Sequence, residues 1–132
     1  MEYQFLRHNV YFIQLKRFNR EFIMYHLSNI LFYQNPEFFH FHSDSVNHEK
    51  SILITDDCID SLIPYLDGTE YLIYNCIQVT QTNEYLNESG FIKELSSKFA
   101  HENIPILYIT TFQSNFILFE SKFTEKVISK LI

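Results

Sequence analysis

The sequence predicts an α+β fold with antiparallel sheets and with helices packed on one face of each sheet. Segments of strand length that are rich in aromatic and β-branched residues alternate with segments whose apolar residues recur at helical spacing. The order strand, helix, strand, strand, helix occurs twice within 132 residues. We therefore expect two small subdomains, residues 1–68 and 69–132.

The first run of elements begins with a strand at residues 10–15, which aromatic and β-branched residues dominate. A helix follows and ends before Pro36, because proline cannot continue a helix. Residues 38–41 and 51–55 are the next two strand candidates, and the polar stretch between them suits a hairpin loop. A short helix then ends near Gly68.

The second run begins with a nearly continuous apolar strand at residues 71–79, as expected for a central strand. A helix follows, for which Ser89 is a suitable cap and Asn103 a suitable stop. Strands at 104–111 and 115–119 and a closing helix complete the run. Each half resembles a ferredoxin-type unit without its last strand. We expect this strand to be missing, to be shared, or to be supplied by a partner chain or a further segment.

Composition and charge exclude several classes of function. The chain has 14 Phe and 9 Tyr, so it can bury a core, and its formal net charge of −6 with scattered basic residues argues against nucleic-acid binding. Gly68 and Gly90 are the only glycines, which excludes a glycine-rich phosphate loop. No apolar run approaches the roughly 20 residues that span a bilayer. Two cysteines without paired spacing indicate a reducing compartment, the cytoplasm.

Candidate catalytic residues have simpler structural explanations. Asp56 and Asp57 could act as an acid–base pair or as a cation site, but capping of the following helix explains them more simply. Cys58 and Cys76 lack a setting that would activate a thiol, so we expect both to be buried and inert. We therefore predict no catalytic residue, no cofactor and no enzymatic activity.

Three histidines are candidate metal ligands. His40 and His42 stand two apart on a predicted strand, so both rings can face the same side, and His48 lies across the predicted hairpin. Three imidazoles could bind zinc. Because no acidic or cysteine ligand has a helpful spacing, we predict no metal site.

Residues 103–118, NIPILYITTFQSNFIL, resemble the strand, turn and strand of the ACT-type domains in the CASTOR family of arginine sensors. The opening MEYQFLRHNV and the segments LSNILF, FFHF and SILITDD follow the first ACT half of that family in order and spacing. Short bacterial ACT proteins look similar too. The resemblance implies a tandem ACT, ferredoxin-like fold and a regulator that binds an amino acid and catalyses nothing.

The resemblance also implies a ligand site. Helix N-termini attract a carboxylate, and Gly90 allows close backbone approach, so we expect the start of the second long helix to bind the ligand. By position, Pro105 and Ile106 match the serine and valine that hold arginine in the family. Arginine is the implied ligand, and because Pro105 has neither hydroxyl nor amide, other amino acids remain open. The expected ligand-binding residues are Ser89, Gly90, Phe91, Pro105 and Ile106.

A partner surface follows from the same resemblance. Phe112, Gln113 and Asn115 match the partner-binding turn of the family, which implies a GATOR-type protein partner and a role in TOR signalling. Since the family binds its ligand between ACT units, we expect a homo-oligomer, such as a dimer, or fusion to further ACT units. The alternative is a ferredoxin-like protein–protein assembly module with no small-molecule ligand.

Overall fold

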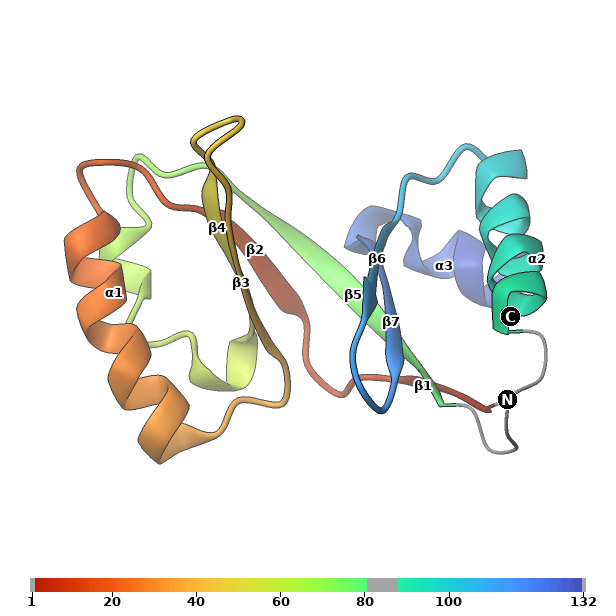
Figure 1. The fold of residues 1–132 in the computed structure, drawn as a ribbon, viewed down its shortest axis with the longest axis horizontal. Coiled ribbons are helices and arrows are strands. Elements are labelled where there is room, and N and C mark those ends of the chain that lie inside the picture. Colours follow the sequence, from red (N-terminus) through yellow and green to blue (C-terminus); the bar gives the residue numbers. More distant parts are fainter. Residues whose placement is uncertain (1, 81–87, 132) are drawn as a thin grey trace. The chain divides into compact units, whose positions relative to one another are not determined.

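The computed structural model describes residues 2–80 and 88–131 (Figure 1). The contacts within the chain divide it into two compact units. The N-terminal unit is Arg7–Ile73, and the C-terminal unit combines Met1–Leu6 with Tyr74–Ile132. The boundary between Ile73 and Tyr74 falls inside one strand. The subdomain boundaries expected from the sequence, 1–68 and 69–132, remain a prediction.

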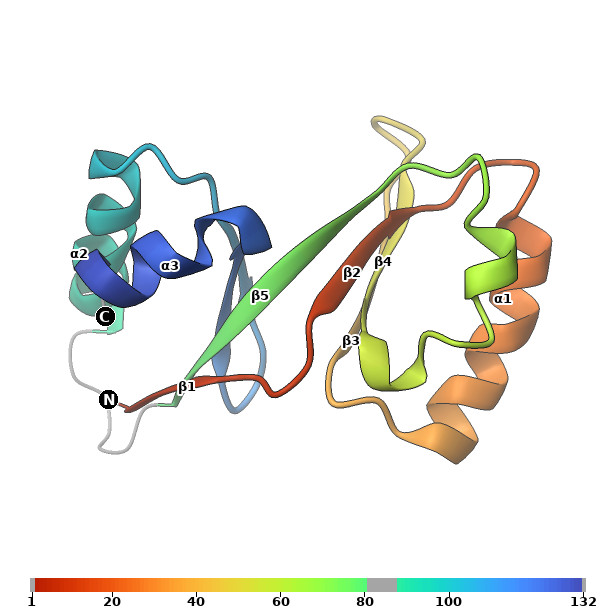
Figure 2. The same cartoon turned by 180° about the vertical axis from the view of Figure 1, so that it is seen from behind.

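The N-terminal unit contains a sheet in the order β3–β4–β2, and the first residues of β5 follow beside β2. Neighbouring strands in β3–β4 and β4–β2 run antiparallel. Figure 2 shows the short turns that follow β4 on the same side of the sheet as α1. The elements are β2 (Val10–Gln14), α1 (Arg20–Asn29) with a π-helical turn (Ile30–Gln34), β3 (Phe39–Ser43), β4 (Lys50–Thr55) and the beginning of β5 (Tyr71–Thr80).

Helix α1 packs on this sheet through residues spaced three and four apart. Ile23, Leu27 and Ile30 are buried against apolar residues of β2 and β4, because every second strand residue faces the helix. Met24 and Leu31 also recur at helical spacing in this segment, but each is 42% exposed, so they lie at the margin of the buried stripe.

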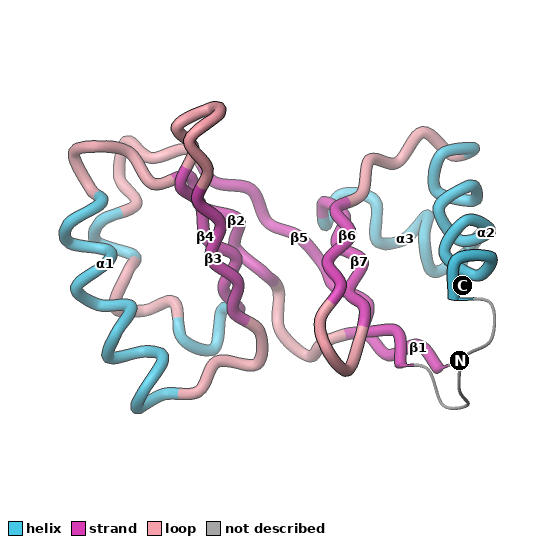
Figure 3. The backbone as a smooth tube through the Cα atoms, in the orientation of Figure 1, coloured by secondary structure: helices cyan, strands magenta, loops and turns pink. Residues whose placement is uncertain are grey.

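The C-terminal unit contains a sheet in the order β6–β7–β5 with β1 paired to β5. Its core joins strand residues such as Ile77 and Phe119 to Leu95 and Phe99 of the long helix. Figure 3 shows the helices of each unit on one side of its strands, as the sequence predicted. The elements besides β5 are β1 (Glu2–Phe5), α2 (Glu88–His101), β6 (Leu107–Thr110), β7 (Asn115–Glu120) and α3 (Thr124–Lys126), which continues as a π-helical turn (Val127–Leu131).

Strand β1 occupies the edge of the C-terminal unit beside β5, where the sequence suggested that a strand was missing. Its residues pair antiparallel with the end of β5, from Glu2 opposite Thr80 to Phe5 opposite Ile77. The Phe5 ring packs edge-to-face on Phe119, with 6.4 Å between ring centroids. The first strand predicted from the sequence begins at residue 10, so β1 was not predicted, because a four-residue strand has little pattern of its own.

The cap predicted for the residues after β4 is wrong. Two separate 3₁₀ turns, Asp56–Cys58 and Ile63–Tyr65, stand where one short helix was expected, and the first has no side-chain cap. Asp57 instead accepts a 3.0 Å hydrogen bond from the Glu37 amide. The Thr55 hydroxyl likewise bonds across the sheet to the Phe38 backbone. These side chains form hydrogen bonds with backbone groups of the residues that precede β3, rather than with those of a helix.

The predicted C-terminal end of α2 is confirmed, and the predicted cap at its N-terminal end is wrong. Asn103 has a left-handed backbone with φ of 58°, and the Ile104 amide donates to the Phe99 carbonyl at 3.0 Å, which closes the helix as predicted. The helix already begins at Glu88, so Ser89 lies inside it and is not its cap. Among the described residues, no helix is long and apolar enough to cross a membrane.

A charged cluster holds the backbone that leads into β2. Both Glu37 carboxylate oxygens accept backbone amides, from Arg7 and His8, and the His8 ring lies 3.0 Å from Glu37 Oε1. The hydrogen bond to Glu37 raises the pKa of His8. Burial alone would raise the pKa of Glu37, but the bonds from Arg7 and His8 lower it overall.

We expect this cluster to stabilise the fold most between the two shifted pKa values. The Glu37 contribution is present above its unfolded pKa and lost as pH falls through its lowered folded pKa, whereas the His8 contribution is lost as pH rises through its raised folded pKa. The melting temperature, measured across pH, should fall less steeply at both the acidic and the alkaline end in Glu37→Gln than in the wild type. In Asp60→Asn its pH dependence should be unchanged. Identical pH profiles for wild type and Glu37→Gln would contradict this assignment.

Candidate functional site

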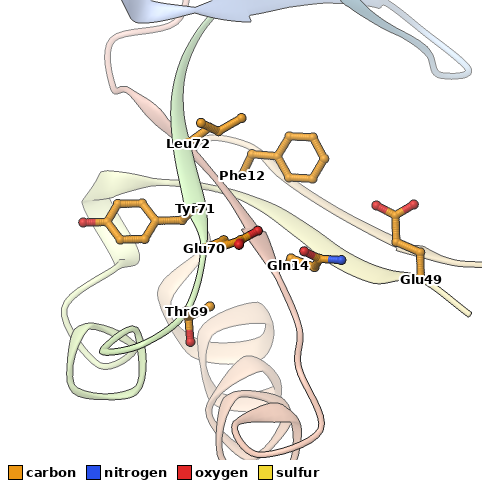
Figure 4. Close-up of a pocket in the computed structure, with 7 residues that line it drawn as sticks. All are labelled: Phe12, Gln14, Glu49, Thr69, Glu70, Tyr71 and Leu72. Atoms are coloured by element: carbon orange, nitrogen blue, oxygen red, sulfur yellow. The ribbon is translucent and has the colours of Figure 1, made fainter.

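A cavity of about 550 Å³ opens on the N-terminal unit (Figure 4). Its lining comes from β2, from the residue that precedes β4, and from the start of β5. This volume lies within the range of about 300–1,000 Å³ that is typical of small-molecule sites. The lining residues are Phe12, Gln14, Glu49, Thr69, Glu70, Tyr71 and Leu72.

Strand alternation selects the side chains that face this cavity. Phe12 and Gln14 flank Ile13, which is buried in the core, so they project from the opposite face of β2. Figure 4 shows Glu70 beside Gln14, while the Tyr71 ring points to the other side of its strand.

Backbone pairing brings the two carboxylates of the cavity toward the same end of β2. The Gln14 amide donates to the Glu70 carbonyl at 3.4 Å, and the Leu15 amide donates to the Lys50 carbonyl at 2.8 Å. Strands β4 and β5 therefore both begin beside the end of β2. Glu49 and Glu70 each precede one of these strands by one residue, so both line the cavity.

A buried hydrogen-bond network supports this end of the cavity. Asn19, which is 2% exposed, accepts from the Lys16 amide at 2.8 Å and donates to the Thr69 hydroxyl at 2.5 Å. The Thr69 hydroxyl in turn donates to the Tyr65 carbonyl at 3.3 Å. These hydrogen bonds link the loop after β2 to the segment before β5, at the residue that precedes Glu70.

The charge of the cavity favours a cationic group. Two carboxylates, Glu49 and Glu70, line it, and its described lining residues include no lysine or arginine. The Gln14 amide adds a hydrogen-bonding group, and the Phe12 ring offers an apolar surface on which a hydrocarbon stem or a cation can lie. The arrangement suits an ammonium or guanidinium group carried on a short apolar chain.

A second cluster of polar side chains lies on the hairpin that joins β3 and β4. His42 Nε2 is 2.7 Å from Asp44 Oδ2, and Glu49 completes a set whose ligand atoms all lie within 4.8 Å of one another. The backbone hydrogen bond from Asn47, together with the bond to His42, lowers the pKa of Asp44. Glu49 therefore belongs both to this cluster and to the cavity.

The histidines predicted from the sequence separate in the structure. His40 is partly buried, and burial lowers its pKa, with a further contribution from His42. His48 is exposed, with a left-handed φ of 53° in the hairpin turn. Of the three predicted histidines, His42 belongs to the cluster. The other two ligands are the carboxylates of Asp44 and Glu49, which were not predicted from their spacing in the sequence.

The ligand-binding residues expected from the resemblance stay a prediction. Ser89, Gly90 and Phe91 belong to the beginning of α2, but their side chains and residues 81–87 lie outside the described residues. Pro105 is exposed, and the Ile106 side chain is partly buried against the core of the C-terminal unit.

The turn between β6 and β7 presents part of the expected partner surface. Phe112 is fully exposed and Gln113 is exposed, while hydrogen bonds between Thr111 and Ser114 close the turn. Asn115 is only 7% exposed, because it already belongs to β7. Its side chain therefore leaves little surface for a partner.

Comparisons with known proteins identify the fold. No curated protein matches the chain. A protein from Agrobacterium tumefaciens matches with a TM-score of 0.67 and 16% identity, over 98% of this chain and 84% of that one. The regulatory subunit of aspartate kinase from Thermus flavus matches with a TM-score of 0.62 and 7% identity, over 99% and 95%. A Vibrio cholerae protein of unknown function, described as a possible transport protein, gives 0.60 and 13%, over 98% and 85%.

These structural likenesses, at low identity, show the fold, which is the ACT-type α+β arrangement predicted from the sequence. The family evidence comes from the sequence itself. Residues 72–132 match the family model described as ACT domain. This segment runs from β5 through the last helical turn of the C-terminal unit. Residues 72–132 are therefore similar to an ACT domain.

Proposed function

We propose that this chain is a non-catalytic regulatory module that binds an amino acid with a positively charged side chain. The observation that carries the proposal is the cavity in which Glu49 and Glu70 stand without a basic residue among the described lining. Paired carboxylates complement a guanidinium or ammonium group. The similarity of residues 72–132 to an ACT domain supports a regulatory role based on a small ligand.

Arginine is the first ligand to test. Its guanidinium suits two carboxylates, and its hydrocarbon stem suits the surface of Phe12. The resemblance to CASTOR-type ACT units points to the same amino acid. It extends the proposal to a cytoplasmic role in TOR signalling through a GATOR-type partner at the exposed residues Phe112 and Gln113. The buried thiols of Cys58 and Cys76 accord with a reducing compartment.

We expect arginine to raise the melting temperature of the purified chain more than the other standard amino acids do, because a ligand that binds the native state stabilises it. Glu70→Gln should abolish the shift, since it removes one of the two charges that face the ligand. Glu94→Gln, on the exposed face of α2, is the matched control and should retain it.

A third variant separates the two candidate sites. If Gly90→Ala abolishes the shift and Glu70→Gln preserves it, the ligand binds at the start of α2 and the cavity is not its site. Absence of any selective shift at millimolar concentrations of each amino acid would overturn the ligand-binding proposal.

One observation favours the alternative, a ferredoxin-like assembly module without a small ligand. Large aromatic side chains are exposed along α1 and the π-helical turn after it, and between Phe22 and Glu37 no Asp, Glu, Lys or Arg interrupts them. Under this alternative, sedimentation should show self-association that Phe32→Glu disrupts and that no amino acid affects. The most exposed of these aromatic residues are Tyr25, Phe32 and Tyr33, at 77%, 77% and 81%.

A further inference from the structure

The β3–β4 hairpin gathers three potential metal ligands at one point on the N-terminal unit. His42 lies near the end of β3, Asp44 begins the turn, and Glu49 stands immediately before β4. Their ligand atoms, one imidazole nitrogen and two carboxylate oxygens, lie within 4.8 Å of one another. We propose that His42, Asp44 and Glu49 form a binding site for a divalent transition-metal ion, with Zn²⁺ as its representative.

The donor set selects this class of ion. An imidazole nitrogen with two carboxylates suits Zn²⁺, Co²⁺ or Ni²⁺, whereas Mg²⁺ and Ca²⁺ prefer sets made of oxygen alone. Tetrahedral zinc with bonds near 2.1 Å separates its ligand atoms by roughly 3.4 Å. His42 Nε2 and Asp44 Oδ2 are 2.7 Å apart, so the ion would replace their hydrogen bond after a small opening movement.

The hairpin holds these ligands in place before any ion binds. The Asp44 amide donates to the Glu49 carbonyl at 3.0 Å, which fixes the two acidic residues across the turn. Asp44 Oδ1 accepts the Asn47 amide at 2.8 Å, so Oδ2 remains directed at His42. This preorganisation lowers the entropy cost of assembling a three-ligand site.

The neighbouring Lys50 ammonium is held away from the site. Lys50 pairs with Ser43 in the ladder, and its ammonium donates to the Ser43 hydroxyl at 2.7 Å. Strand alternation places Ser43 and Lys50 on the face opposite to His42. The His42 side chain is 47% exposed, so an ion can enter from solvent and water can complete its coordination.

The experiment is a titration of the full chain with Zn²⁺ by calorimetry, and with Co²⁺ by visible absorption. We expect one saturable ion per chain and Co²⁺ bands typical of low coordination number. His42→Ala should weaken Zn²⁺ affinity by at least about tenfold, the scale on which loss of a supporting group already acts. Glu49→Gln should weaken it as well, and its neutral amide preserves the shape of the side chain.

His48→Asn is the matched control. It removes a histidine from the same hairpin but from outside the cluster, and asparagine tolerates the left-handed backbone at that position. Its affinity should equal that of the wild type. Absence of saturable binding to the wild-type chain would overturn the proposal. So would a Zn²⁺ affinity in both His42→Ala and Glu49→Gln that equals the affinity of the wild type. This test does not depend on any amino-acid ligand, so it stands apart from the function proposed above.

Discussion

Removal of residues 1–6 is expected to lower the free energy of unfolding of the C-terminal unit by about 3 kcal/mol, the scale of losing one partly buried phenylalanine together with a row of backbone hydrogen bonds. Strand β1 pairs with β5 over four register positions, and Phe5 packs into the core against Phe119. Without β1, the edge of β5 and the Phe119 ring lose their cover. Denaturant unfolding, followed in the C-terminal unit by NMR, measures the loss.

Two variants show whether the loss comes from β1 itself. Phe5→Ala should reproduce most of the destabilisation, whereas Tyr3→Ala, at a 44% exposed position of the same strand, should cost much less. Joining residues 1–6 after Ile132 through a glycine–serine linker should restore stability, because the strand can then reach the same edge from the other terminus. If the truncated chain unfolds at the same denaturant concentration as the full chain, β1 makes no structural contribution.

The second large effect is expected from Asn19→Ala, which should destabilise the N-terminal unit by about 2–4 kcal/mol, since it removes the hydrogen bonds that the Lys16 amide and the Thr69 hydroxyl make with this buried side chain. Asn19 joins the Lys16 amide to the Thr69 hydroxyl within a buried setting. Alanine fills less space and can neither accept nor donate. Thermal unfolding measures the loss of stability.

Asn29→Ala provides the comparison, because this asparagine is exposed at the end of α1 and its replacement should change stability by less than about 0.5 kcal/mol. Asn19→Ala should also weaken ligand binding, if Glu70 depends on Thr69 for its position. Equal melting temperatures for the two variants would mean that the Asn19 network contributes no net stability.

The parts of the fold that the sequence predicted are those with a strong local pattern. The strand at 71–79 corresponds to β5, and the helical stripe through Leu95 and Phe99 corresponds to α2. Asn103 was identified as a stop because a left-handed residue after a helix is a local feature. Strand β1 was missed because its strand character comes from its partner more than 70 residues away.

The candidate site was harder to predict because it arises from strand neighbours rather than from spacing. Glu49 and Glu70 are separated widely along the chain and line one cavity only because β4 and β5 both begin beside the end of β2. One signal was present in the sequence: Glu70 immediately precedes the predicted strand 71–79, and Glu49 stands two residues before the predicted strand 51–55. The hairpin cluster had a clearer signal, since Asp44 follows His42 by two residues and the predicted hairpin brings Glu49 back toward them.

The pairing of β1 with β5 has a consequence for synthesis of the chain. The whole N-terminal unit is inserted in sequence between these two strands, so it leaves the ribosome complete while β1 still lacks its partner. The C-terminal unit must then close a loop of this length before its edge strand can dock, and such long-range contacts form slowly. Folding should therefore be sequential, with the N-terminal unit first and the docking of β1 among the last events.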